Sequence, residues 1–240
     1  MNWPASRVPI PKFEYDNLIQ IGDTPLSRKI LLIGGGGHCK DVIWLLRESI
    51  KPEFLGIIDG RLPVDSTVCG VPVLGDDSIL DRFSQAEVII SIGSSRRRYQ
   101  VWKFIRNKFP HFRFPSVIHP SVHLAPGVKV GEGTLVTTGS SIANDVVIGN
   151  QVVVNLQAVI GHDSQIGDCA TLAPGTVIAG GVAVGEGFEF GPNSTVGSGL
   201  QLGAWGASGP GAGIMANTPE RTLMLGNPAR PIRTLDFPTI

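Results

Sequence analysis

The feature that most constrains the fold of this chain is an apolar residue at every sixth position between residues 118 and 202. Every one of these positions is apolar, although apolar residues make up only 42% of the chain. The series consists of Ile118, Leu124, Val130, Val136, Ile142, Ile148, Val154, Ile160, Ile166, Leu172, Ile178, Val184, Phe190, Val196 and Leu202. A period of six fits neither a helix nor an ordinary alternating strand, and it predicts a parallel β-helix built from hexapeptide repeats.

Each hexapeptide predicts a short strand with its apolar residue inward, followed by a turn. A glycine often comes directly after the apolar residue, as at Gly131 and Gly203, and we expect it to form the sharp corner. The pattern resembles the left-handed β-helix of hexapeptide acyltransferases, in which three hexapeptides close one triangular coil. The resemblance alone supplies the handedness, because connections between parallel strands are otherwise right-handed. After Leu202 we expect the register to loosen.

Composition excludes several classes of partner. The 240 residues contain 20 Lys and Arg against 20 Asp and Glu, so no net charge attracts nucleic acid or an anionic membrane. Cys39, Cys69 and Cys169 are scattered, without the spacing of metal ligands or of a disulfide framework. No apolar stretch is long enough for a membrane span or a secretory leader. The sequence therefore predicts a cytoplasmic protein with no nucleic-acid or membrane partner.

The first part of the chain has a different pattern. Residues 1–28 are rich in proline and predict an extended arm, either a disordered leader or a strap. Strands are expected at Lys29–Ile33, 54–58, 71–74 and 88–92, with helices between them and a last helix that ends before Pro110. This alternation predicts a small doubly wound α/β domain with a parallel sheet over residues 29–113. The β-helix domain then covers 114–232, and 233–240 form a tail.

A glycine loop follows the first predicted strand and opens the first helix. Its residues are Gly34, Gly35, Gly36 and Gly37, followed by His38. Such a loop lets phosphate oxygens reach the N–H groups of a helix N-terminus, and Asp59 ends the next strand, where a ribose hydroxyl would be held. Cys39 occupies the last position of the dinucleotide fingerprint, which favours a mononucleotide-type site over an NAD site. A purely structural turn is the alternative.

Residues 34–40, which read GGGGHCK, resemble the loop that opens the sugar-nucleotide-binding domain of sialic-acid and bacillosamine-type acyltransferases. The combination of this loop with a C-terminal hexapeptide helix covers residues 29–232. The resemblance implies a Rossmann-like domain in which Gly34 to His38 contact the diphosphate and the sugar and Asp59 contacts the nucleoside.

Three consecutive arginines, Arg96 to Arg98, fall in the first turn of a predicted helix, where the helix dipole disfavours cations. One interpretation is an anion site formed by Ser94, Ser95 and an arginine, so Ser94 and Arg96 are candidate nucleotide-sugar contacts. The other interpretation is a solvated basic face.

His162 is the one histidine of the predicted β-helix beyond its entrance, where His119 and His123 lie. These spacings do not build a three-histidine zinc site, which argues against a metal and against a metal-dependent hydratase. His162 comes two residues after the inward-facing Ile160, so it is expected to point outward at a corner.

The neighbours of His162 suit acyl transfer. Asp163 would orient the imidazole, Asn155 lies seven residues upstream, and Gly180 lies one eighteen-residue coil further on. Imidazole ordinarily titrates near pH 6.5, so it can take a proton from an attacking amine or hydroxyl near neutral pH. The N–H of Gly180 would stabilise the oxyanion of a thioester under attack.

The family resemblance places its general-base histidine on His162 and its thioester-contacting glycine on Gly180. Two positions depart from the family. Asp163 stands where bacillosamine-type enzymes have Glu, and Thr171 stands where many carry a second histidine. Candidate contacts of coenzyme A, besides Gly180, are Thr171, Ser198, Asn227 and Pro228.

Together these observations predict an acetyl-CoA-dependent N-acetyltransferase that modifies the 4-amino group of a nucleotide-linked amino sugar by direct transfer. The family resemblance also implies a homotrimer with sites shared between neighbouring chains. O-acetylation of a sialic-acid-type sugar is an alternative. A non-catalytic nucleotide-binding scaffold is another.

Overall fold

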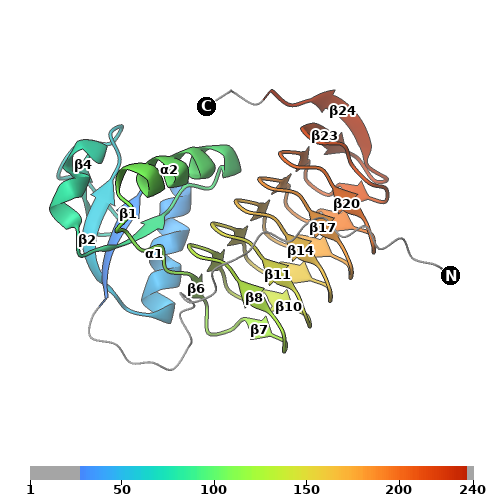
Figure 1. Cartoon of the computed structure of the whole chain (residues 1–240), viewed down its shortest axis with the longest axis horizontal. Coiled ribbons are helices and arrows are strands. Elements are labelled where there is room, and N and C mark those ends of the chain that lie inside the picture. The colour runs from blue at the N-terminus through green and yellow to red at the C-terminus, as the bar shows by residue number, and fades with distance from the viewer. Residues whose placement is uncertain (1–27, 237–240) are drawn as a thin grey trace.

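A computed structural model describes residues 28–236 of the chain. These residues form an α/β domain followed by a long stack of short strands (Figure 1). The expected N-terminal arm, apart from Arg28, and the last four residues of the expected tail lie outside the described residues.

The α/β domain is built on one five-stranded sheet of order β3-β4-β2-β1-β5. All neighbours are parallel except β3 and β4, which form an antiparallel pair. A strand as short as β3 carries too little pattern to be predicted. The elements are β1 (Lys29–Ile33), α1 (Gly37–Ser49), β2 (Glu53–Ile58), β3 (Thr67–Val68), β4 (Val71–Gly75), the 3-10 helix η1 (Asp77–Phe83), β5 (Glu87–Ile90) and α2 (Ser95–Lys108).

Strand β1 shows why this domain has helices on both faces of its sheet. Successive side chains of a strand point to opposite faces. Ile30 and Leu32 belong to the core cluster that includes α1, whereas Leu31 and Ile33 belong to the cluster that includes α2. The predicted doubly wound parallel sheet is therefore confirmed.

The rest of the chain is a parallel β-helix whose short strands pair with strands eighteen residues away, as Ile142 pairs with Ile160. Each strand ends on the apolar residue of its hexapeptide. The strands are β6 (Val117–Ile118), β7 (His123–Leu124), β8 (Lys129–Val130), β9 (Leu135–Val136), β10 (Ser141–Ile142), β11 (Val147–Ile148), β12 (Val153–Val154), β13 (Val159–Ile160), β14 (Gln165–Ile166), β15 (Thr171–Leu172), β16 (Val177–Ile178), β17 (Ala183–Val184), β18 (Glu189–Phe190), β19 (Thr195–Val196), β20 (Gln201–Leu202), β21 (Ala207–Ser208) and β22 (Gly213–Ile214).

The strands form three sheets, which are the three faces of a triangular prism. The six-stranded face contains β7, β10, β13, β16, β19 and β22, and the five-stranded face contains β8, β11, β14, β17 and β20. The eight-stranded face runs from β6 to β21 and continues into β23 (Thr222–Leu225) and β24 (Arg230–Thr234). The last two strands form an antiparallel pair that follows the regular coils.

The corners are made differently from the prediction. The residue with positive φ is the third after the inward apolar residue, as at Asp145, Asp163 and Gly181. The glycine directly after the apolar residue serves close packing between coils, because a Cβ on Gly161 would lie 2.5 Å from the nitrogen of Gly180.

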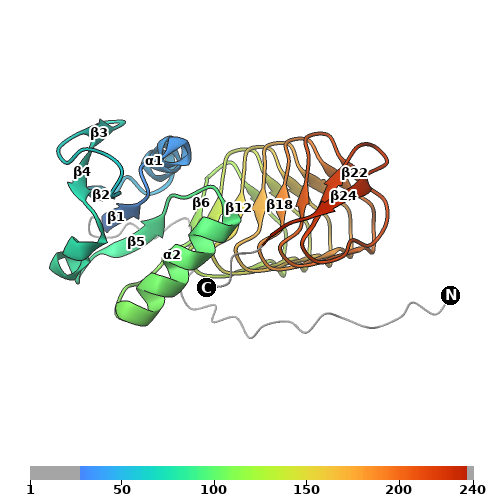
Figure 2. The same cartoon turned by 90° about the horizontal axis from the view of Figure 1, so that it is seen from above.

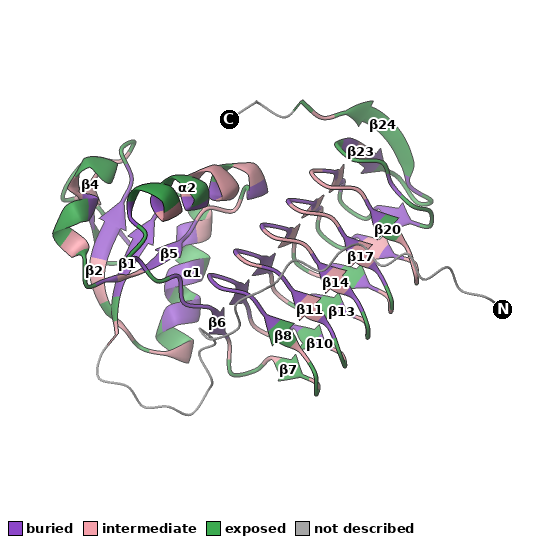
Figure 3. Ribbon diagram, in the orientation of Figure 1, coloured by how far each residue is buried: buried purple, intermediate pink, exposed green. Residues whose placement is uncertain are grey.

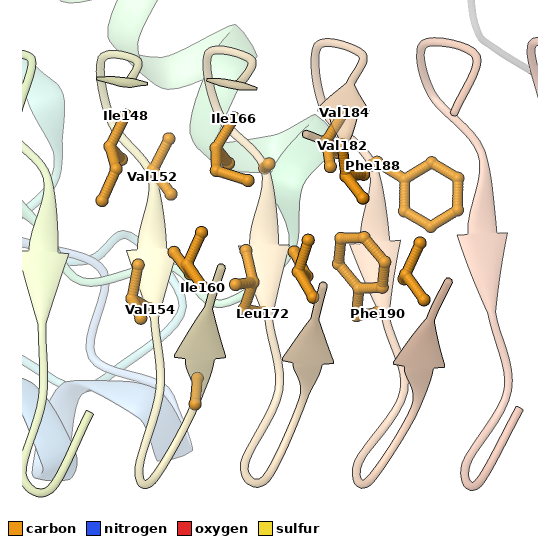
Figure 4. Close-up of a cluster of buried hydrophobic side chains, with 14 of the residues drawn as sticks. Ile148, Val152, Val154, Ile160, Ile166, Leu172, Val182, Val184, Phe188 and Phe190 are labelled. Atoms are coloured by element: carbon orange, nitrogen blue, oxygen red, sulfur yellow. The ribbon is translucent and has the colours of Figure 1, made fainter. Parts of the chain in front are cut away.

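The inward side chains fill the prism in layers (Figure 4). Phe188 and Phe190 are buried, with ring centroids 4.6 Å apart, so they pack in the core. Leu124 is the exception to the expected burial of the apolar row: it lies in the first coil and is 42% exposed. The expectation that the register loosens after Leu202 is wrong, because β21 and β22 keep the six-residue period.

The α/β domain packs against the N-terminal part of the eight-stranded face of the β-helix, with α2 lying beside it (Figure 2). The outward residues Val117, Leu135 and Val153 of this face are consequently at most 1% exposed. Tyr99 of α2 also contacts Trp205 on a coil, with ring centroids 5.1 Å apart. The burial of these three residues contrasts with the exposed residues on strands of the other two faces (Figure 3).

Candidate active site

His162 lies in the turn between β13 and β14, at the corner where the six-stranded and five-stranded faces meet. The positive φ of Asp163, +59°, is the corner conformation that lets two adjacent side chains converge. Its Oδ2 lies 2.8 Å from Nδ1 of His162. Both side chains are about two-thirds exposed, at 69% and 68%, so the pair is open to a ligand.

Gly180 lies one coil further on, directly beside the imidazole. A Cβ built on Gly180 would lie 2.6 Å from Nε2 of His162, so only glycine leaves room for the ring. Gly181 also donates its N–H to the carbonyl of His162 at 2.7 Å. Among the hydrogen bonds within residues 28–236, none uses the N–H of Gly180. The structure thus brings His162, Asp163 and Gly180 together.

Asn155 and Thr171 lie away from this corner in the same chain. Asn155 occupies the corner between the eight-stranded and six-stranded faces, and its Oδ1 accepts the N–H of Leu156 at 2.8 Å. Thr171 lies on the eight-stranded face, where its hydroxyl contacts Ser95 Oγ at 2.9 Å. Neither side chain is brought next to His162 of its own chain.

The other predicted contacts of coenzyme A lie along the same corner of the β-helix as Gly180 or near its C-terminal end. Ser198 is exposed one coil beyond Gly180. Asn227 and Pro228 are joined by a cis peptide bond between β23 and β24, and the amide of Asn227 packs against Gly213.

The glycine loop links β1 to α1. Gly34 has a φ of +98°, and a Cβ there would lie 2.6 Å from Cγ1 of Ile92. A Cβ on Gly35 would meet Leu62 at 2.4 Å. By contrast, nothing lies within 4 Å of a Cβ on Gly36 or Gly37. The loop is therefore packed tightly at its start and open at the N-terminus of α1, where N–H groups can receive a phosphate.

Asp59 holds this loop in place. Its Oδ2 accepts the N–H of Gly35 at 2.8 Å, and its Oδ1 accepts the N–H of Arg61 at 2.9 Å. Burial by itself would raise the pKa of Asp59, but the hydrogen bonds from Arg61 and Gly35 lower it to about 2. Both carboxylate oxygens thus have partners within the domain.

A cleft of about 240 Å³ opens beside Asp59, between the ends of β1 and β2 and helix α2. Its apolar wall includes Phe104 and Val101, and its cations are Arg61 and Arg97. Ligands of open α/β sheets bind at the carboxyl ends of the strands, where strand order reverses. The sequence indicated Arg97 only as one of three consecutive arginines, and it did not indicate Arg61. Successive side chains of an α-helix point in different directions around its axis, so neighbouring arginines of α2 face different surroundings.

His38 lies in the first turn of α1, with its side chain 14% exposed. Its Nδ1 is 3.8 Å from the carboxylate of Asp41, and its buried Nε2 has no partner among the described residues. Burial lowers the pKa of His38, and the charge of Arg98 lowers it further. The imidazole of His38 is therefore neutral at neutral pH.

The three arginines do not form a solvated basic face. Arg96 donates to the carbonyl of Asp236, Arg97 lines the cleft, and Arg98 is only 1% exposed. The N-terminus of α2 is occupied by a carboxylate of the protein itself, because Glu189 Oε1 accepts the N–H of Ser95 at 2.6 Å. Ser94 is the N-cap residue of α2, and its side chain makes no capping hydrogen bond.

A larger groove of about 650 Å³ runs along the five-stranded face. Its edge carries Asp168, Glu186 and Glu220, and burial raises the pKa of Asp168 and Glu186. Carboxylates there disfavour the phosphates of coenzyme A. His162 does not line this groove.

Within residues 28–236, no group of three His, Cys, Asp or Glu side chains is arranged to hold a metal ion. None of the described helices has the length and apolarity that crossing a bilayer requires. Cys39, Cys69 and Cys169 are free thiols.

The two parts of the predicted site lie on opposite sides of the β-helix. The glycine loop belongs to the domain that packs on the eight-stranded face, whereas His162 lies at the corner between the other two faces. A ligand held at the glycine loop of one chain therefore faces away from His162 of the same chain.

A triangular β-helix with an outward histidine beside a glycine, preceded by a nucleotide-type α/β domain, defines a hexapeptide-repeat acyltransferase. Residues 29–105 match the family model described as the PglD N-terminal domain. A search of curated proteins finds no match.

Solved structures agree. A mutant of perosamine N-acetyltransferase from Caulobacter crescentus, in complex with CoA and GDP-perosamine, is 33% identical with a TM-score of 0.79, over 85% of this chain and 97% of that one. The acetyltransferase domain of PglB from Neisseria gonorrhoeae, in complex with acetyl coenzyme A, is 26% identical with a TM-score of 0.77, over 86% and 100%. WeeI from Acinetobacter baumannii gives the same values.

The chain belongs to the sugar acyltransferase family of the PglD, or bacillosamine, type. The fold predicted from the sequence, an α/β domain followed by a left-handed β-helix, is confirmed.

Proposed function

We propose that this protein transfers the acetyl group of acetyl-CoA to the 4-amino group of a nucleotide-linked amino sugar. The observation that carries the proposal is the contact between Nδ1 of His162 and Asp163, beside a glycine that leaves room for the ring. The perosamine N-acetyltransferase structure with CoA and GDP-perosamine supports the same co-substrate and the same class of acceptor.

In the proposed mechanism the sugar amine attacks the thioester carbonyl directly. The carboxylate of Asp163 accepts a hydrogen bond from Nδ1–H of His162, which leaves Nε2 unprotonated and able to take the proton that the amine nitrogen loses, so that the ring becomes an imidazolium. The N–H of Gly180 stabilises the oxyanion of the tetrahedral intermediate. The C–S bond then breaks, and the imidazolium returns the proton to the sulfur of coenzyme A. No acyl-enzyme is needed.

The nucleotide would bind at the open N-terminus of α1, with its phosphates on the N–H groups of Gly36 and Gly37. The adjoining cleft, with Arg61 and Arg97, would take the nucleoside. Since this domain faces away from His162 of the same chain, the amine of a bound sugar would reach His162 of a neighbouring chain. We therefore propose a homotrimer with shared sites. The three free cysteines agree with a cytoplasmic location.

The test is mass spectrometry of products after incubation with acetyl-CoA and a panel of UDP-, GDP- and dTDP-linked 4-amino sugars. We expect at least one member to gain a single acetyl group, and His162→Ala to lower its rate. If no member of the panel gains an acetyl group and a free or CMP-linked sialic acid does, the protein is an O-acetyltransferase. If calorimetry detects no binding of acetyl-CoA at all, the protein is a non-catalytic scaffold.

A further inference from the structure

Arg98 is the charged residue at the centre of the contact between the two domains. It is 1% exposed, and all three of its nitrogens donate hydrogen bonds. The acceptors are Gln151 O (2.7 Å) for Nε, Ile92 O and Gly93 O (both 2.8 Å) for Nη1, and Cys169 O (2.8 Å), Ala170 O (3.1 Å) and Thr171 Oγ1 (2.8 Å) for Nη2. The buried charge is therefore shared among carbonyl and hydroxyl dipoles.

These acceptors belong to parts of the chain that are far apart in sequence. Ile92 and Gly93 follow β5 in the α/β domain, whereas Gln151 and the segment 169–171 lie on two successive coils of the β-helix. One guanidinium group thus ties the end of β5 to the β-helix. The carboxylate of Glu189 at the N-terminus of α2 adds a second link between the same two parts.

The segment that Arg98 holds is also a wall of the glycine loop. A Cβ on Gly93 would lie 3.5 Å from Cβ of His38, and a Cβ on Gly34 would lie 2.6 Å from Ile92. Ser91 reinforces the contact, since its hydroxyl donates to the carbonyl of Gly34 at 2.6 Å. Displacement of this segment therefore displaces the loop and His38 with it.

We infer that Arg98 is a positioning residue, which sets where the glycine loop lies relative to the β-helix and so aims the bound sugar amine at the thioester. This inference rests on the proposed function. A misplacement of 1 Å far from the reacting atoms can cost about 10²-fold in rate. Arg98 touches neither substrate in this scheme, so its effect falls on the rate of transfer.

The test is Arg98→Lys, which keeps the positive charge but replaces the planar fork by a single ammonium group with three donors. Initial rates are compared for the nucleotide-linked amino sugar and for the corresponding free amino sugar at high concentration. The free sugar lacks the phosphates that the glycine loop would bind. We expect kcat for the nucleotide-linked sugar to fall about 10²-fold with little change in KM, and the rate for the free sugar to stay within about 2-fold of wild type.

Arg106→Gln is the matched control. Arg106 lies on the same helix and pairs with Glu132 of the β-helix, but it does not contact the segment after β5. We expect this variant to keep the wild-type ratio of the rate for the nucleotide-linked sugar to the rate for the free sugar. If Arg98→Lys does not fold, Thr171→Val is used instead, because it removes one acceptor of Arg98 and should lower this ratio of rates by a smaller factor.

Equal losses for both sugars, or no loss for either, would overturn the inference. Failure of the proposed function is seen separately, because the wild-type protein would then acetylate no nucleotide-linked sugar before any variant is compared.

Discussion

The imidazole of His162 occupies the space that a side chain on Gly180 would fill, since a Cβ there would lie 2.6 Å from Nε2 and 2.7 Å from Cε1. These residues are one coil apart, so the regular stacking of the β-helix itself sets their separation. The ring is therefore placed by its glycine neighbour as well as by Asp163.

Gly180→Ala should displace the imidazole and abolish most of the activity. A contact of 2.6 Å is shorter than carbon and nitrogen atoms tolerate, so the exposed ring must rotate away and lose its contact with Asp163. Because a positioned general base contributes about 10²- to 10⁴-fold, we expect kcat to fall by at least about 10²-fold. Steady-state kinetics with acetyl-CoA measure the loss.

Gly197→Ala is the matched control for Gly180→Ala, because it also adds a methyl group to a coil of the β-helix but does not displace His162. A Cβ on Gly197 would make only ordinary contacts, the nearest at 3.6 Å. Both alanine variants should retain the melting temperature of wild type within a few degrees. Retained activity in Gly180→Ala would show that His162 need not lie where the structure places it.

Asp163→Asn should lower the rate less than loss of His162 does. The amide oxygen of asparagine can still accept a hydrogen bond from Nδ1–H of His162, but this acceptor no longer carries a negative charge. Charged and neutral hydrogen bonds differ by about 1 kcal/mol, so we expect kcat to fall about 5-fold. A His162→Ala, Asp163→Asn double variant should be no slower than His162→Ala. Additive losses would instead indicate that Asp163 acts independently of the histidine.

The β-helix could be predicted from the sequence because one six-residue period repeats along it. In every hexapeptide of the row the inward position is apolar, which distinguishes it from the outward positions. The same period placed Gly180 beside His162, since strands pair eighteen residues apart. The six-residue period did not show where the stack of coils ends. Ser208 occupies the next inward position but is polar, so only the pairing of its strand shows that the coils continue.

The contact between domains was not predictable in the same way. Arg96, Arg97 and Arg98 are identical in type, and their different surroundings depend on how the two domains pack. Thr171 was expected near coenzyme A from its position in the family pattern. The eighteen-residue repeat assigns Thr171 to the eight-stranded face. The repeat does not show that the α/β domain packs on this face, because that contact depends on tertiary structure.

Thr171→Val tests the placement of this residue. Valine keeps the volume but removes one of three acceptors of Arg98 Nη2, and it leaves the buried hydroxyl of Ser95 without its partner. We expect the free energy of unfolding to fall by about 1–3 kcal/mol in urea titrations. The Kd of coenzyme A, measured by calorimetry, should stay at its wild-type value. A weaker Kd without loss of stability would favour the contact with coenzyme A that the sequence predicted.

Asp59 should make stability depend on pH in acid. Its pKa is lowered from 3.8 to about 2 in the folded protein, so folding favours the carboxylate, and this contribution is present above about pH 4 and lost as the pH falls toward 2. A shift of this size corresponds to about 2 kcal/mol. The free energy of unfolding of wild type should therefore exceed that of Asp59→Asn by a constant amount above pH 5, and the difference should shrink below pH 4.

Arg61→Gln removes two of the donors to Asp59 and should reduce the same pH dependence. Urea titrations between pH 3 and 6 measure both effects, and a difference between wild type and Asp59→Asn that stays constant down to pH 3 would show that the carboxylate is not stabilised in this way.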